Sequence, residues 1–73
     1  LEPEDEFSYL ICASNYSLLK QYDQAVNILN QLIKRNQKST KAYLYRGSAY
    51  YSMGNINRAL KDYDVVIKLD PDE

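Results

Sequence analysis

The sequence predicts an all-α fold, in which two antiparallel helical hairpins stack side by side as a short solenoid. One observation is an internal repeat, because side chains recur in phase after 34 residues with no insertion. The first copy contains Tyr9, Leu10, Ser14, Tyr16, Ala25, Ile33 and Lys34, and the second contains Tyr43, Leu44, Ser48, Tyr50, Ala59, Ile67 and Lys68. The other observation is the spacing of apolar residues, which follows the helical period and nowhere sustains the alternation of a β-strand.

The first hairpin is expected to consist of helices at about residues 6–19 and 22–35. In the first helix, apolar or small residues occur at the spacing i, i+3, i+4, i+7: Tyr9, Cys12, Ala13 and Tyr16. In the second helix, one face collects Ala25, Ile28, Leu29, Leu32 and Ile33. Lys20 stands in the turn between the two helices, where the second copy has Gly54.

The second hairpin repeats this plan with helices at about residues 40–53 and 56–69. The inward positions are Tyr43, Arg46, Gly47 and Tyr50 in the first helix, and Ala59, Leu60, Tyr63, Val66 and Ile67 in the second. Gly54 and Asn55 separate these helices, and Asn55 can cap the second one. Ser39 or Thr40 can cap the first one. Glycine inside a helix costs about 1 kcal/mol relative to alanine, so Gly47 indicates close contact with a neighbouring helix.

The second copy resembles the tetratricopeptide repeat (TPR) family, whose pattern is W-x2-L-G-x2-Y, then A-x3-F, then P. The matching residues are Tyr43, Arg46, Gly47 and Tyr50, then Ala59 and Tyr63, then Pro71. In the first copy, Tyr9, Cys12, Ala13, Tyr16, Ala25 and Leu29 fill the same positions, while Gln37 replaces the proline. The resemblance implies two helix–turn–helix units stacked as a right-handed superhelix that binds other proteins.

The phase of the repeat also predicts the organisation of the chain. Residues 1–5 resemble residues 69–73 position by position, two periods earlier. We therefore expect 1–5 to be the end of a preceding repeat, 6–39 one TPR repeat and 40–73 the next, all taken from a longer array. In such a piece, the apolar end of the last helix is uncovered, so we expect self-association through the open repeat ends.

Composition argues against several classes of function. Histidine is absent and Cys12 is the only cysteine, so we expect no metal site, no cofactor and no catalytic nucleophile with its usual base. Cys12 is expected to be a core thiol, and a single cysteine fits an intracellular, cytoplasmic setting. A net charge of −1 argues against nucleic acid as a partner, and the apolar runs are too short for a membrane-spanning helix. The sequence thus predicts a protein that is not an enzyme.

The candidate binding site follows from the resemblance, because the first helix of each TPR repeat lines a concave face. From the first repeat that face receives Phe7, Leu10, Ser14, Ser17 and Leu18, and from the second Lys41, Leu44, Tyr45, Ser48, Tyr51 and Ser52. These residues lie off the expected core stripe, and exposed apolar groups with small polar gaps suit an apolar peptide or helix of a partner protein. We expect the strongest contacts from Phe7, Leu10, Leu44, Tyr45 and Tyr51.

Alternatives remain open for the same residues. The apolar face would instead pack against neighbouring repeats or other chains, which makes the chain a structural or oligomerisation segment. The basic residues between Lys34 and Arg46 would contact an acidic partner. A known TPR subtype grips a C-terminal carboxylate with Lys, Asn and Arg, but this chain has Leu10, Ser14, Lys41 and Tyr45 at those positions. With one cation in the set, such a clamp is not expected.

Overall fold

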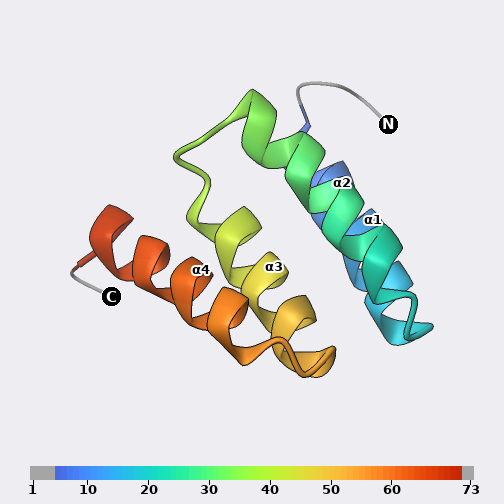
Figure 1. Ribbon diagram of the computed structural model, residues 1–73. Coiled ribbons are helices and arrows are strands. Elements are labelled where there is room, and N and C mark those ends of the chain that lie inside the picture. The colour runs from blue at the N-terminus through green and yellow to red at the C-terminus, as the bar shows by residue number, and fades with distance from the viewer. Residues whose placement is uncertain (1–4, 72–73) are drawn as a thin grey trace.

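The computed structural model describes residues 5–71, which form four α-helices and, within that range, no β-strand. The helices are α1 (Glu6–Leu18), α2 (Tyr22–Arg35), α3 (Thr40–Ser52) and α4 (Ile56–Leu69). They form two antiparallel hairpins that lie side by side, with α2 and α3 in contact at the junction (Figure 1). The predicted all-α fold is confirmed, and the helix ends agree with prediction to within one residue. Most of the expected end of a preceding repeat, at 1–4, and the last two residues, 72–73, lie outside the described range.

Three helices begin with a side chain that accepts hydrogen bonds from free backbone N–H groups. The Asp5 carboxylate accepts from Phe7 N at 3.0 Å and from the Ser8 hydroxyl at 2.7 Å. These bonds, chiefly the one from the Ser8 side chain, hold the pKa of Asp5 below its usual value. Ser39 caps α3 and Asn55 caps α4, both as predicted.

The turn inside each hairpin requires a residue in the left-handed region of backbone space. In the second hairpin this residue is Gly54, with φ of 83°. In the first hairpin the equivalent residue is Lys20, with φ of 60°. A residue with a Cβ pays about 1–2 kcal/mol in that region, so the turn at Lys20 is strained where the turn at Gly54 is not.

The core lies between the first hairpin and α3. It is a cluster of small and aliphatic side chains with one tyrosine: Tyr9, Leu10, Ala13, Ala25, Leu29, Leu32 and Ala42. Ala25 and Ala42 are fully buried, which shows that the helix backbones approach closely at these points. The expectation that Leu10 lies off the core is wrong, since its side chain is 6% exposed. Cys12 is half-buried rather than enclosed.

Gly47 permits the close approach of α3 and α4. A Cβ atom at this position would lie 2.7 Å from Cε1 of Tyr63 and 3.2 Å from Cβ of Asp62. The predicted packing role of this glycine is confirmed. In the first hairpin, Ala13 takes the position of Gly47 and Leu29 takes the position of Tyr63. The methyl group that alanine adds is thus offset by a leucine that is smaller than the tyrosine, and both residues are buried.

Arg46 pairs with a buried carboxylate inside the second hairpin and also bonds to the first hairpin. The Arg46 guanidinium on α3 donates to both carboxylate oxygens of Asp62 on α4, at 2.7 and 2.9 Å. Its third bond, at 2.9 Å, goes to the side-chain oxygen of Asn30 on α2. The Asp62 side chain is 5% exposed. The hydrogen bonds that Arg46 donates to it raise the pKa of Arg46 above its usual value. The rings of Tyr43 and Tyr50 lie 5.5 and 5.9 Å from the guanidinium carbon, at cation–π distance.

Removing one partner of this ion pair should lower the free energy of unfolding far more than replacing both partners with apolar residues. In Arg46→Cys, the buried Asp62 carboxylate loses its counter-ion, so we expect the free energy of unfolding to fall by about 3–5 kcal/mol. In Arg46→Cys with Asp62→Ile, which installs the residues found at positions 12 and 28 of the first repeat, most of that loss should be recovered. Urea unfolding followed by circular dichroism measures both. The exposed pair between Asp64 and Lys68 is the control, because Lys68→Met should change stability by less than about 0.5 kcal/mol. Equal losses in the single and double variants would contradict this expectation.

Relieving the strained turn should stabilise the chain. We expect Lys20→Gly to raise the free energy of unfolding by about 0.5–1 kcal/mol, because glycine removes the clash but is more flexible in the unfolded chain. Lys20→Ala keeps the Cβ and should give no comparable gain, whereas Gly54→Ala should lower stability by about 1 kcal/mol. Thermal unfolding of the three variants decides the point. A Lys20→Gly chain no more stable than the parent would show that the turn stores no strain.

Candidate functional site

A cleft runs between α1 and α3, on the side of the molecule where the two hairpins face each other. It consists of two adjoining hollows of about 430 and 320 Å³, which share Ser14 from α1 and Tyr45 from α3. The larger hollow extends toward the C-terminal ends of the two helices, and the smaller one toward their N-terminal ends. The shared residues make the two hollows one continuous surface.

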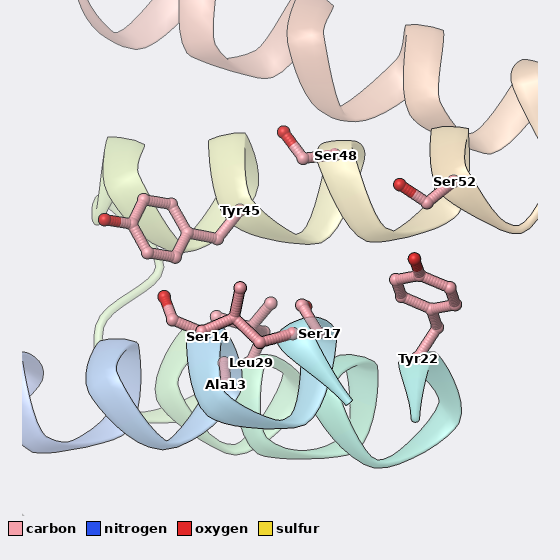
Figure 2. Close-up of a pocket in the computed structure, with 9 residues that line it drawn as sticks. Ala13, Ser14, Ser17, Tyr22, Leu29, Tyr45, Ser48 and Ser52 are labelled. Atoms are coloured by element: carbon pink, nitrogen blue, oxygen red, sulfur yellow. The ribbon is translucent and has the colours of Figure 1, made fainter. Parts of the chain in front are cut away.

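The larger hollow has an apolar floor and hydroxyl groups along its walls. Ala13 and Leu29, which are almost fully buried, form part of the floor. Figure 2 shows Tyr45 and Tyr22 toward opposite ends of the larger hollow, with Ser14 and Ser17 between them on the α1 side. Rigid tyrosine side chains of this kind offer a large apolar contact area and a polar tip, which suits them to binding surfaces.

The electrostatics of the cleft are simple. Lys41, at the N-terminal end of α3, is the one charged side chain among the residues that line either hollow. The Ser48 hydroxyl lies 3.4 Å from the Tyr63 hydroxyl, and the two groups share a hydrogen bond. Within residues 5–71, every buried side-chain nitrogen and oxygen has a hydrogen-bond partner, and no group of acidic, cysteine or histidine side chains could hold a metal ion. The cleft is therefore suited to apolar contact and to exposed hydroxyl groups.

Most of the residues predicted for the concave face do line this cleft. They are Phe7, Leu10, Ser14, Ser17, Leu18, Lys41, Tyr45, Ser48 and Ser52. Leu10 contributes to the smaller hollow although most of its side chain belongs to the core. Leu44 lies elsewhere, in a hollow of about 300 Å³ that it shares with Val66 on α4. Tyr51 is 63% exposed and lines none of these hollows.

Sequence reasoning missed several residues of the cleft, one of them from the second helix of a repeat. Tyr22 is the first residue of α2, and it reaches the cleft because the turn at Lys20 brings the start of α2 beside the end of α1. The position of Tyr22 directly after that turn is the feature of the sequence from which its place in the cleft could have been predicted. Ile11 and Asn15 also line the smaller hollow, and they directly follow the predicted Leu10 and Ser14 in the sequence of α1.

Comparison with known families assigns both halves of the chain. Two family models described as tetratricopeptide repeat match residues 8–39 and 40–73. Together with the two stacked hairpins, these matches decide the family. The chain belongs to the tetratricopeptide repeat family. As a TPR protein with this architecture, it is a protein-interaction module in general terms.

Named relatives carry the same kind of repeat sequence. The chain is 38% identical over 60 residues to RNA polymerase II-associated protein 3 of Mus musculus, which is 82% of this chain and 9% of that protein. It is 38% identical over 52 residues to Hsp70-Hsp90 organizing protein 1 of Glycine max, and 36% identical over 52 residues to Hsp70-Hsp90 organizing protein 3 of Arabidopsis thaliana. Each of these alignments covers 71% of this chain and 9% of the relative. The chain thus spans about a tenth of the length of these curated relatives.

Among residues 5–71, no helix is both long enough and apolar enough to cross a membrane.

Proposed function

We propose that this TPR unit binds an apolar segment of a partner protein in the cleft between α1 and α3. The observation that carries the proposal is the continuous cleft, in which tyrosine and serine side chains surround an apolar floor and Lys41 is the one charged lining residue. A peptide or short helix with few charges would lose little hydration energy on entering such a cleft. Because helices form both walls of the cleft, little ordering entropy would oppose binding.

The chemistry of the cleft favours this ligand over an acidic C-terminal tail. A peptide carboxylate is held best by two or more cationic or amide side chains that converge on it. Leu10, Ser14, Lys41 and Tyr45 meet in the smaller hollow, so the positions of the carboxylate-gripping TPR subtype come together here. Lys41 is the one cation among them, which supports an apolar ligand with at most one carboxylate near that end.

Peptide selection tests the proposal directly. Peptides displayed as a random library, with blocked termini, would be selected against the chain, and the affinity of the best one measured by fluorescence anisotropy. We expect an apolar peptide whose binding weakens at least about tenfold in Tyr45→Ala and in Ser14→Arg, because these changes remove and obstruct the shared middle of the cleft. A peptide of the same length that carries several acidic residues and a free C-terminal carboxylate should bind more weakly than the selected peptide, since Lys41 cannot neutralise that much negative charge.

Tyr51→Ala is the matched control, because Tyr51 is an exposed α3 tyrosine that lines none of the hollows. It should leave the affinity unchanged, and circular dichroism should confirm that all three variants keep their helical content. If the selected peptides bind equally well to the Tyr45 and Ser14 variants but not to the Tyr51 variant, the cleft is not the site.

A second candidate function is association through the outer side of α4. Leu60 and Ile67 on this helix are 60% and 63% exposed. Among the described helices, α4 packs only against α3, and it lies at one edge of the molecule (Figure 1). Exposed aliphatic side chains grouped on one helix favour an interface with another chain or with a neighbouring repeat.

Self-association should therefore depend on concentration and on these two side chains. Sedimentation velocity between about 10 μM and about 1 mM should show the average mass rising with concentration. Leu60→Ser with Ile67→Ser should keep the chain monomeric over the same range, because the apolar area that drives association is removed. A parent chain that stays monomeric at the highest concentration would rule out this candidate.

A further inference from the structure

The outer side of α4 has an internal counterpart that is already covered, namely the side of α2 that meets α3. We define the α4 face by Leu60, Asp64 and Ile67, which share one side of the helix at spacings of four and three residues. One period earlier, the residues are Val26, Asn30 and Ile33 on α2. The structure of the α2–α3 junction therefore indicates what kind of helix would fit the α4 face.

The apolar residues of the two faces differ in exposure although they occupy equivalent positions. Val26 and Ile33 are half-buried, and Ile33 packs against the core cluster that includes Ala42 of α3. Leu60 and Ile67 are 60% and 63% exposed. The difference follows from the presence of α3 beside α2 and the absence of a described helix in the same place beside α4.

The polar residue between them differs in charge. On α2, Asn30 accepts a hydrogen bond of 2.9 Å from Nη1 of Arg46. On α4, the equivalent residue is Asp64, whose side chain is 58% exposed and whose protein partner is Lys68 at 2.9 Å, one turn along the same helix. A carboxylate accepts a stronger, charge-assisted bond from a guanidinium than an amide does. The α4 face is thus better suited to an arginine than the junction that already holds one.

From these equivalences, we propose that the α4 face binds a partner helix that presents alanine and, four residues later, arginine, as α3 does with Ala42 and Arg46. The alanine allows the close helix approach seen at the junction, where Ala42 is fully buried. The arginine donates to Asp64 and the aliphatic residues of the partner cover Leu60 and Ile67. The proposal concerns a different surface from the cleft and does not depend on it.

A second copy of the chain would fit this face less well. In a second copy, the helix equivalent to α3 and free to dock is α1, which has Ser8 and Cys12 where α3 has Ala42 and Arg46. Asp64 would then face a thiol instead of a cation. Self-association through the α4 face should accordingly be weaker than binding of an arginine-bearing helix.

The test uses α3 itself as the probe. A peptide of residues 39–53 with blocked termini would be titrated into the 15N-labelled 73-residue chain and followed by NMR. We expect saturable shifts at the amides of Leu60, Asp64 and Ile67. The peptide with Arg46→Leu should bind at least about tenfold more weakly, and so should the parent peptide to an Asp64→Asn chain, while combining the two changes should add no further loss.

Two chain variants serve as controls. Asp23→Asn neutralises an exposed carboxylate on α2 and should leave peptide affinity unchanged. Tyr45→Ala alters the cleft and should also leave it unchanged, which separates this test from that of the proposed function. Equal affinity of the arginine and leucine peptides would overturn the proposal, as would shifts centred on Ser14 and Tyr45 or no saturable shift at the α4 face. Concentration-dependent shifts of the α4 face in the chain alone that the peptide cannot displace would also overturn it, by assigning the face to a second copy.

Discussion

The arrangement of the two hairpins depends on the hydrogen bonds that the Arg46 guanidinium on α3 donates. It binds Asp62 on α4 through two hydrogen bonds and Asn30 on α2 through a third, so one side chain connects three helices. A carboxylate as buried as that of Asp62 is stable only when it is fully paired. Because the guanidinium is planar and its donors are fixed, the pairing sets the position of α3 between its neighbours, and with it the width of the cleft between α1 and α3.

The internal repeat shows two solutions to one packing problem. At the equivalent positions, the first hairpin has Cys12 and Ile28, which are apolar, while the second has the Arg46–Asp62 ion pair. The neighbouring positions also change together, from Ala13 and Leu29 to Gly47 and Tyr63. Changes in one helix are matched by changes in its partner, so the backbone plan stays the same while the chemistry of the interior differs. The ion pair also supplies a hydrogen-bond donor, because Arg46 reaches Asn30 on α2. An apolar pair at these positions has no donor to offer.

The pattern of the sequence was sufficient to predict the helices, because spacing, caps and turns are local properties. It also predicted the close approach at Gly47, since a glycine lowers helix stability and is tolerated there because a neighbouring helix needs the space. It could not predict which helix covers which face. Leu10 and Leu44 occupy the same position of the repeat, yet the first is 6% exposed and the second 42%. The pairing of Arg46 with Asp62 escaped prediction for the same reason, because it joins residues on different helices whose relative rotation no local pattern fixes.

The two candidate binding surfaces depend differently on this framework. The cleft needs the relative position of α1 and α3, and therefore the junction that Arg46 holds. The α4 face lies within a single helix, and it needs only that α4 remain packed on α3 through Asp62, Tyr63 and their contacts with Arg46 and Gly47. Its counterpart in the repeat, the side of α2 that carries Asn30, packs against an arginine-bearing helix in this structure. Arg46 itself lines neither surface, so a ligand on α4 and a ligand in the cleft would contact separate sets of side chains on a framework that the arginine holds together.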